Sequence, residues 1–276
     1  MRLEGRRVVG GRAEGVVLAA ERPLSLLGGV DAATGAVLDP ESPIRGERVG
    51  GRVLAVPHGK GSTVGSYVLY ALRKRGVAPS AILAAKAETI LAVGAVISDV
   101  PMVDRVSVDL LRTGDRVAVD ADAGVVDAPD LVERHVVTAF LEREGRVLVV
   151  RRSEKVGSFR GKWSGVSGFL EGTDPEAQAR REVEEETGIT DVTLLAKGAV
   201  VRGRGDDTVY TIHPFRFSAP RGDVRLDWEN VEYRWVTPEE MAALDAVPKL
   251  VVAYGATEKP EGRVRTSSRQ RESMRT

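Results

Sequence analysis

The sequence predicts an α/β protein with two domains. Its 276 residues exceed the length that one hydrophobic core usually organises and are comfortable for two. Short apolar runs of strand length alternate with a few helical patterns up to about residue 126. The short polar stretch Asp127–Asp130, which contains a proline, is a plausible linker to a second series of strands around an acidic helix. We therefore expect one domain over residues 1–128 and another over residues 132–256.

The first domain reads as short strands around few helices. Alternating apolar and small residues up to about residue 25 predict a first strand, and the glycine-rich stretch from Gly28 predicts an irregular hairpin or loop. Apolar runs at 53–56, 81–84 and 101–103 predict strands, helical spacing predicts a helix over 64–75, and residues 115–126 predict a closing hairpin. Residues 90–97 are apolar enough for a buried strand or a buried helix, and the pattern does not separate the two.

The second domain opens with a clear hairpin over residues 135–141 and 146–152. Further strands are predicted near 192–195, 199–201, 210–217 and 231–236, and a final helix is predicted to start at Pro238. From about residue 257 the chain carries Pro, Gly, Ser and five arginines without an apolar period. This composition predicts a disordered basic tail over residues 257–276.

Composition narrows the function classes. Acidic and basic residues balance at 40 each, so nothing indicates a nucleic-acid or anionic-membrane partner. The absence of cysteine excludes disulfides, a cysteine nucleophile and an iron–sulfur cluster held by this chain. Without an apolar run of membrane-spanning length or a signal-peptide pattern, we expect a soluble cytoplasmic protein. The three histidines follow no ligand spacing, and we interpret each as structural.

The acidic helix has clear ends in the sequence. Asp174 is a good N-cap, and Pro175 stands where a first helical residue can lack its N–H. Gly188 fits the position just after the last helical residue. We expect a helix between them.

Within this helix, Glu182, Glu185 and Glu186 are spaced i, i+3 and i+4, so their carboxylates project from one face. Clustered carboxylates repel one another unless a cation lies among them. Hard oxygen ligands suit Mg²⁺ or Mn²⁺, which bridge and neutralise phosphate oxygens. The alternative is a solvated acidic helix face, which spacing alone does not exclude.

The string Arg181–Ile189 resembles the second half of the Nudix box, whose pattern is Arg-Glu-apolar-x-Glu-Glu-x-Gly-apolar, at every specified position. The resemblance covers about residues 132–256 and implies an α/β/α sandwich that hydrolyses a diphosphate bond. It implies that Glu182, Glu185 and Glu186 hold the divalent metal ions, with Glu185 also catalytic, and that Arg181 braces the cluster.

The first half of the box departs from the family pattern. Thr173 stands where the family has a glutamate, and Gly168 lies one residue closer to the helix than usual. Glu171 is a candidate replacement for the missing carboxylate. The departure bears on metal stoichiometry and rate more than on the fold.

The loop Gly59–Thr63 in the first domain has the chemistry of an anion site. It fails the phosphate-binding P-loop pattern because Gly61 separates Lys60 from Ser62. Its glycines nevertheless allow close backbone approach, and the helix start at Ser62 and Thr63 offers free N–H groups to an anion. The alternative is that Ser62 is simply the N-cap of the helix.

Three stretches together, which begin at Gly28, Pro57 and Ala92, resemble the small subunit of archaeal phosphomevalonate dehydratase. This family belongs to the aconitase-X group of the mevalonate pathway to isoprenoids and corresponds to the swivelling β/β/α domain of aconitase. The resemblance covers residues 1–128, and the string Gly59–Tyr67 is distinctive.

In that family the serine that matches Ser62 accepts the proton in dehydration. Because a serine has too high a pKa to act alone, it would need the helix dipole and a cation such as Lys60. We also expect Lys60, Gly61 and Thr63 to bind substrate. The resemblance further implies a separate large subunit that holds a [4Fe–4S] cluster and most substrate contacts.

Cationic residues lie before the acidic helix. Arg151 and Arg152 end the predicted hairpin, and Lys155, Arg160 and Lys162 follow. Two interpretations stay open: Arg151 and Arg152 contact a substrate diphosphate, or they are solvated.

The leading hypothesis is a bifunctional fusion of a dehydratase small-subunit part with a metal-dependent Nudix hydrolase. A second hypothesis, motivated by Thr173, makes the Nudix half a non-catalytic diphosphate sensor that regulates the dehydratase. A third is a Nudix-type isopentenyl diphosphate isomerase. It ranks last because that class is known for a catalytic cysteine, which this chain lacks.

Overall fold

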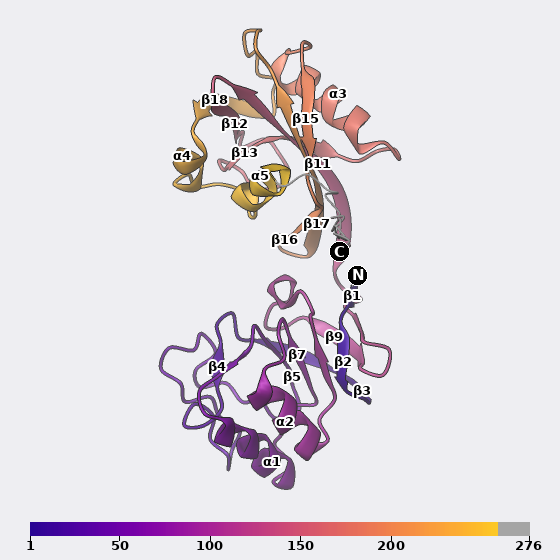
Figure 1. The fold of residues 1–276 in the computed structure, drawn as a ribbon, viewed down its shortest axis with the longest axis vertical. Coiled ribbons are helices and arrows are strands. Elements are labelled where there is room, and N and C mark those ends of the chain that lie inside the picture. Colours follow the sequence, from indigo (N-terminus) through magenta and orange to yellow (C-terminus); the bar gives the residue numbers. More distant parts are fainter. Residues whose placement is uncertain (259–276) are drawn as a thin grey trace, which may run out of the picture. The chain divides into compact units, whose positions relative to one another are not determined.

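The computed structural model describes residues 1–258, which divide into two compact units (Figure 1). The first comprises residues 1–133 together with 204–209, and the second comprises residues 134–203 together with 210–258. Residues 257 and 258, predicted to begin a disordered basic tail, instead end a helix, and Thr257 is buried. The rest of the predicted tail lies outside the described residues.

The first unit is built on one mixed sheet and a small two-stranded sheet. The order of the large sheet is β1-β10-β9-β3-β5-β7-β8-β2, and β4 pairs with β6. The strands are β1 (Arg2–Glu4), β2 (Arg6–Val9), β3 (Arg12–Ala19), β4 (Leu24–Ser25), β5 (Val53–Val56), β6 (Gly59–Lys60), β7 (Ala81–Ala84), β8 (Met102–Asp104), β9 (Arg116–Asp120) and β10 (Val125–Asp127). The helical elements are η1 (Thr63–Gly65), α1 (Ser66–Lys74), α2 (Thr89–Ser98) and η2 (Val108–Leu110).

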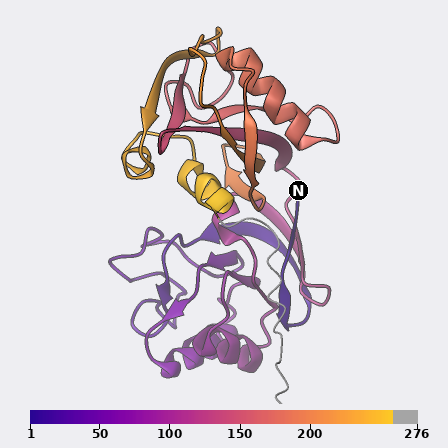
Figure 2. The same ribbon diagram turned by 45° about the horizontal axis from the view of Figure 1, so that its top comes forward.

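The centre of the large sheet is parallel, from β3 through β5 and β7 to β8. Strands β5 and β7 are buried along their whole length, as expected for continuous apolar runs in a parallel sheet covered on both faces. Helices α1 and α2 lie side by side (Figures 1 and 2) and pack into one of the two apolar cores of this unit. The short strands predicted from apolar runs at 53–56 and 81–84 are confirmed.

Residues 90–97, which the apolar pattern left open, form helix α2. The Glu88 side chain caps this helix by accepting hydrogen bonds from the backbone N–H groups of Ile90 and Leu91 at 2.7 and 2.9 Å. Gly94 faces α1, where an added Cβ would lie 2.7 Å from Leu69 Cδ1. The cap and the close helix–helix approach explain why this apolar run becomes a helix.

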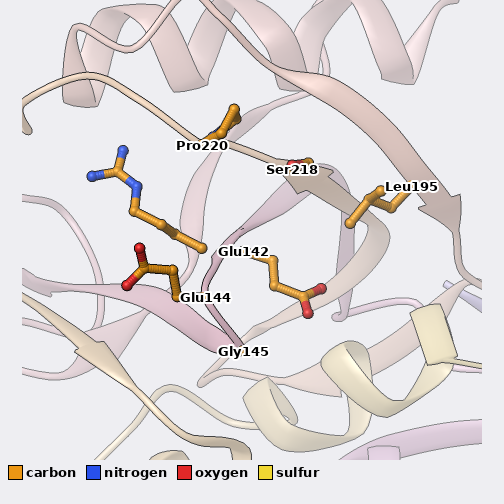
Figure 3. Close-up of a pocket in the computed structure, with 7 residues that line it drawn as sticks. Glu142, Glu144, Gly145, Leu195, Ser218 and Pro220 are labelled. Atoms are coloured by element: carbon orange, nitrogen blue, oxygen red, sulfur yellow. The ribbon is translucent and has the colours of Figure 1, made fainter.

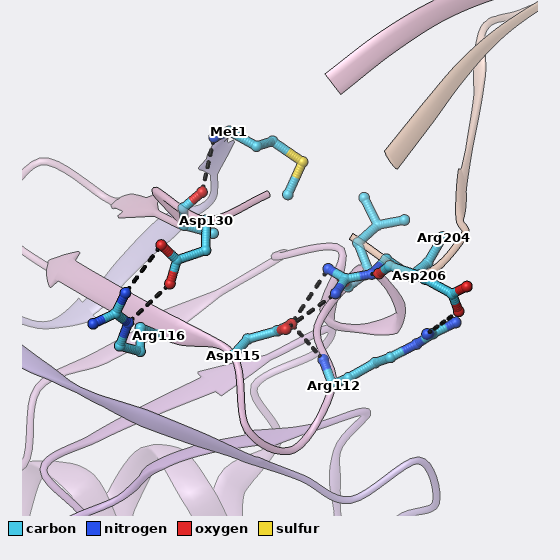
Figure 4. A network of polar contacts seen from close by, with 9 residues as sticks. Met1, Arg112, Asp115, Arg116, Asp130, Arg204 and Asp206 are labelled. Atoms are coloured by element: carbon cyan, nitrogen blue, oxygen red, sulfur yellow. Dashed lines mark hydrogen bonds and ion pairs between the residues drawn. The ribbon is translucent and has the colours of Figure 1, made fainter. Parts of the chain in front are cut away.

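The stretch predicted as a linker is packed rather than free. Ala128 and Leu131 are buried, and the carbonyl oxygens of both accept hydrogen bonds from the N-terminal amine of Met1. Asp130 forms an ion pair with Arg116 at 2.8 Å. Figure 4 shows these contacts beside a second network of the same unit, in which Arg204, Asp115, Arg112 and Asp206 pair with one another.

The second unit contains one eight-stranded sheet. Its main path is β13-β12-β11-β17-β15, with β14 paired to β11, β16 to β17 and β18 to β12. The strands are β11 (Val132–Arg143), β12 (Arg146–Arg152), β13 (Trp163–Ser164), β14 (Val166–Phe169), β15 (Thr193–Lys197), β16 (Val201–Arg204), β17 (Thr208–Ser218) and β18 (Asn230–Val236). The helices are α3 (Pro175–Thr187), α4 (Pro238–Ala242) and α5 (Leu250–Glu258).

Alternate residues of β11 and β12 serve two separate apolar cores. Val137, Ala139 and Leu141 pack with Ala179 and Val183 of α3. The opposite core holds Phe140, Val147 and Val149 with residues of α4 and α5. Helices therefore cover both faces of the sheet, which gives the α/β/α layering. The prediction that the helix starting at Pro238 is the last was wrong, because α5 follows it.

The predicted α/β class with two domains is confirmed. Among residues 1–258, no helix combines the length and the apolar character that crossing a membrane requires.

Candidate functional site

The acidic helix α3 has the predicted ends. Asp174 Oδ1 accepts hydrogen bonds from the N–H groups of Glu176 and Ala177 at 3.0 and 3.2 Å, and Pro175 is the first helical residue. Gly188 ends the helix in the left-handed region with φ of 68°. These local signals fix the register of α3 and place Glu182, Glu185 and Glu186 within one turn of helix.

Glu186 is the most deeply buried of the three, with 5% of its surface exposed. Its Oε1 accepts a hydrogen bond from the backbone N–H of Ser167 at 3.0 Å, and its Oε2 accepts one from Asn230 Nδ2 at 2.7 Å. Burial raises the pKa of the Glu186 carboxyl to about 8, and the two hydrogen bonds offset only part of that effect. A cation next to this group would favour its charged form.

Glu182 is half-buried, whereas Glu185 is exposed. Burial raises the pKa of Glu182, and the nearby charge of Glu185 raises it further. Gln178 Nε2 donates a hydrogen bond to Glu182 Oε1 at 2.6 Å, and Arg181 Nη2 donates to the amide oxygen of Gln178. Arg181 therefore reaches the cluster through Gln178.

Gly168 on β14 lies directly beneath Glu182. A Cβ at this position would lie 1.9 Å from Glu182 Oε1, so only a glycine leaves the carboxylate in place. Thr173 is exposed, as is Glu171. The charge of Glu171 is among those that raise the pKa of Glu182, so this residue contributes to the electrostatics of the cluster.

The segment before β18 adds acidic groups that the sequence did not reveal. The charge of Glu229 contributes to the raised pKa of Glu182, and that of Asp227 contributes to the raised pKa of Glu186. With Asn230, these residues lie forty or more positions beyond the end of α3 in the sequence. These residues are recognised as part of the site only because the folded chain brings them near the glutamates of α3.

The donor types around α3 fit a hard divalent cation. The charges of Glu185 and Glu229 act on Glu182, and those of Glu182 and Asp227 act on Glu186. Carboxylate oxygens are ligands that Mg²⁺ and Mn²⁺ accept. As the side chains stand, no group of three or more His, Cys, Asp or Glu among the described residues is arranged to hold an ion. A metal ion held by these residues would require their side chains to adopt other orientations.

The two arginines before α3 have partners in the structure. Arg151 Nη1 lies 3.5 Å from Glu232 Oε2, and its Nε donates to the carbonyl oxygen of Gly161. Arg152 Nε donates to the carbonyl oxygen of Ser158 at 3.1 Å. Both interpretations of these cations remain predictions.

Ser62 lies on the surface of the first unit, at the start of η1. Its hydroxyl oxygen accepts a hydrogen bond from the N–H of Val64 at 3.3 Å, which is the N-cap geometry. Gly61, with φ of 105°, turns the chain into the helix, and Thr63 is exposed. The N-cap role does not bury the hydroxyl.

The Lys60 ammonium is held by two carboxylates. Its Nζ lies 3.2 Å from Asp39 Oδ2 and 3.3 Å from Glu41 Oε2. The hydrogen bond to Asp39, followed by that to Glu41, raises the pKa of Lys60 above its usual value. Lys60 is therefore a fixed cation beside the loop that contains Ser62.

Two of the three histidines, each interpreted as structural, are in contact. His135 Nδ1 and His213 Nε2 lie 3.1 Å apart on strands β11 and β17, with their rings stacked. Burial, and then the charge of His135, lowers the pKa of His213.

A pocket of about 290 Å³ lies at the hairpin of β11 and β12 (Figure 3). Glu142, Glu144, Leu195 and Ser218 are among its lining residues, and none of the predicted site residues is. Arg143, which also lines the pocket, donates to three backbone carbonyl oxygens and lies over the Trp235 ring, which fixes the local loop.

Comparison with known proteins supports both halves. Residues 2–128 match the family model of the aconitase X swivel domain, and residues 132–254 match that of the NUDIX domain. The phosphomevalonate dehydratase small subunit of Thermococcus kodakarensis is 59% identical over 127 residues, which cover 46% of this chain and 96% of that protein. The corresponding protein of Methanocella arvoryzae is 50% identical over 130 residues, covering 46% and 98%.

Similar solved structures include one for each half. The crystal structure of Thermococcus kodakaraensis aconitase X in its holo-form is 58% identical and covers 46% of this chain and 97% of that chain, with a TM-score of 0.46. The MutT protein from Methanosarcina mazei Go1 is 25% identical and covers 47% and 96%, with a TM-score of 0.41.

The fold and the matches define a two-domain fusion of an aconitase X swivel domain with a NUDIX domain. Through its first domain, the chain belongs to the family of phosphomevalonate dehydratase small subunits.

Proposed function

We propose that the second domain is a Nudix hydrolase that cleaves a diphosphate bond with Mg²⁺ or Mn²⁺. The observation that carries the proposal is Glu186, a carboxyl buried among other acids. Its hydrogen-bond donors, the Ser167 N–H and the Asn230 amide, are both uncharged. Burying an unpaired carboxylate is costly, and a divalent cation supplies the missing positive charge.

Glu182, Glu185 and Glu186 would hold the cation, which when bound neutralises phosphate charge and lowers the pKa of an attacking water. The chain's own groups prepare the site. The Ser167 N–H and the Asn230 amide fix the Glu186 carboxylate, while Gln178 links Glu182 to Arg181. Gly168 leaves room for Glu182 above the sheet. Arg151 and Arg152 would bind the substrate phosphates.

Phosphate release from nucleoside and isoprenoid diphosphates in the presence of Mg²⁺ tests this proposal. We expect activity in the wild type, a loss of at least about 100-fold in Glu185→Gln, and no change in Glu184→Gln. Glu184 is a matched control because it lies on the same helix, is exposed, and is unspecified in the box. Equal activity in the Glu185 and Glu184 variants would remove the assigned role of Glu185.

A second candidate function is a diphosphate sensor. The exposed Thr173, where the family pattern has a glutamate, favours it, because one expected metal ligand is absent. Calorimetry separates the two functions: tight diphosphate binding without turnover supports the sensor, whereas turnover with Mg²⁺ supports the hydrolase.

For the first domain, we propose the small-subunit part of a phosphomevalonate dehydratase-like hydro-lyase. It requires a separate large subunit, which would hold a [4Fe–4S] cluster. Ser62 would accept the proton; its exposure leaves the hydroxyl accessible to substrate. Gly61 and Thr63 would contact substrate at the helix start. Because Asp39 and Glu41 hold Lys60, direct help from this lysine requires that it leave them.

Mixing the chain with a cognate large subunit and 5-phosphomevalonate tests the second half of the proposal. Dehydration should occur with the wild type and be lost in Ser62→Ala. Ser107→Ala is a suitable control, since Ser107 is exposed and its side chain makes no capping hydrogen bond. An active Ser62→Ala complex would contradict the assigned base.

A further inference from the structure

Asn230 is the only asparagine of the chain and lies at the first position of β18. It is 5% exposed and pairs with Arg152 of β12, just beyond an irregularity in the strand register. The neighbouring Glu229 carbonyl oxygen accepts a hydrogen bond from the Ser153 N–H at 2.7 Å. Backbone pairing with β12 therefore fixes the position of Asn230.

The nitrogen and the oxygen of the Asn230 side-chain amide differ in their hydrogen bonding. Nδ2 donates to Glu186 Oε2 at 2.7 Å, across 44 positions of sequence. Oδ1 is buried and has no hydrogen-bond partner among the described residues. About nine in ten or more buried backbone polar groups, and the large majority of buried side-chain polar atoms, are paired in proteins, because an unpaired one loses its hydration without return. Beside Glu186, an unpaired Oδ1 is able to accept a partner that arrives with a ligand.

The chemistry of the amide suits a cation site lined by carboxylates. An aspartate here would repel Glu186, and an apolar residue would leave Glu186 Oε2 without its donor. An amide donates to the carboxylate and also presents a neutral oxygen, which hard divalent cations and their retained waters accept as a partner. Groups that orient metal ligands in this way typically change metal affinity by about 10- to 100-fold when removed.

We propose that Asn230 is a positioning residue of the divalent-metal site: its N–H fixes the Glu186 carboxylate, and its Oδ1 receives the hydrated cation. This inference rests on the proposed hydrolase function of the second domain. It adds to the site a residue that the Nudix box does not contain.

Because the chain has a single asparagine, selective ¹⁵N-asparagine labelling gives one side-chain NH₂ pair that reports on Asn230 alone. We expect addition of Mg²⁺ to shift this pair in a saturable manner, and expect no shift in Glu186→Gln. If Mg²⁺ binds the wild type by calorimetry while the NH₂ pair stays unchanged, the role of Asn230 is refuted and the hydrolase proposal stands. If the wild type binds no Mg²⁺, both fail.

Variants supply the second readout. Asn230→Leu should weaken Mg²⁺ binding by about 10- to 100-fold, whereas Val231→Ala, a change at the exposed neighbouring residue, should not alter it. Asn230→Asp keeps an oxygen but places a second carboxylate beside Glu186. We expect its thermal midpoint to fall in EDTA and to rise with Mg²⁺ by more than that of the wild type. If Mg²⁺ raises the thermal midpoints of the Leu variant, the Asp variant and the wild type equally, Asn230 has only a structural role.

Discussion

Replacement of Glu186 by Gln tests whether burial of this carboxyl raises its pKa and so makes stability depend on pH. The pKa of this group is about 8 in the folded protein and 4.5 as its ordinary value. The folded state therefore keeps a proton that the unfolded state releases, and wild-type stability should fall as pH rises from about 4.5 to about 8 and stay level above that. Gln carries no titrating proton, so the stability of the variant lacks this decrease with pH.

The magnitude follows from the difference of about 3.5 pKa units, 8 minus 4.5, at about 1.4 kcal/mol each, or about 5 kcal/mol as an upper value. At pH 5 the same relation predicts a stability difference between Glu186→Gln and the wild type of less than about 1 kcal/mol. The Gln side chain can keep the Ser167 N–H through its oxygen. Its NH₂ can donate to Asn230 Oδ1 if that amide turns over, so little hydrogen bonding need be lost. We expect Glu186→Gln to be more stable than the wild type by about 3 to 5 kcal/mol at pH 9.

Urea unfolding in EDTA, followed by tryptophan fluorescence, measures this difference. All three tryptophans, Trp163, Trp228 and Trp235, belong to the second unit, so the signal reports that unit. Glu184→Gln is the control and should show no pH-dependent difference from the wild type. A difference between Glu186→Gln and the wild type that is the same at pH 5 and pH 9 would refute the reasoning.

Three further predictions concern single contacts. Gly168→Ala should displace the flexible Glu182 carboxylate, so Mg²⁺ affinity measured by calorimetry falls about 10-fold or more while stability changes by less than about 1 kcal/mol. Gly172→Ala, where an added Cβ meets nothing within 4 Å, should leave both unchanged. Asp104 accepts two hydrogen bonds from the Arg6 guanidinium at 2.9 and 2.7 Å, which lower the pKa of Asp104 below 3.8. The stabilisation is thus present above pH 3.8 and lost as pH falls through the lower folded value. Asp104→Asn should therefore cost about 1 to 3 kcal/mol at pH 7 by urea unfolding monitored by circular dichroism, and a cost that does not shrink as pH falls below 3.8 would contradict this. His213 should titrate below pH 6.5 in an NMR histidine titration, because burial and His135 disfavour its charged form, and a midpoint above 6.5 would contradict the observed contact.

The ends of the acidic helix could be predicted from the sequence because the residues that determine them act locally. Asp174, Pro175 and Gly188 act within one turn of the helix ends, and the glutamates follow the helical period. The same holds for the strands that are buried on both faces, whose apolar runs are continuous.

Long-range contacts account for what the sequence did not show. Asn230 meets Glu186 only because β18 pairs with β12, and His135 meets His213 only because β11 lies beside β17. Residues 90–97 were ambiguous because an apolar run buried in either state looks the same, and the deciding groups are the Glu88 cap and the contact of Gly94 with α1.

Lys60 illustrates the same point for the first domain. The loop pattern indicated a cation beside Ser62, but the partners that hold it, Asp39 and Glu41, come from a loop about twenty positions earlier. No local pattern announces such an ion pair, because each charge alone is typical of a solvated surface.

The rate of Mg²⁺-dependent phosphate release by the wild type and by Glu185→Gln tests the central claim most directly. We predict release from a diphosphate substrate by the wild type and a rate lower by at least about 100-fold in the variant. Equal rates in the two proteins would show that the glutamates of α3 do not carry the hydrolysis.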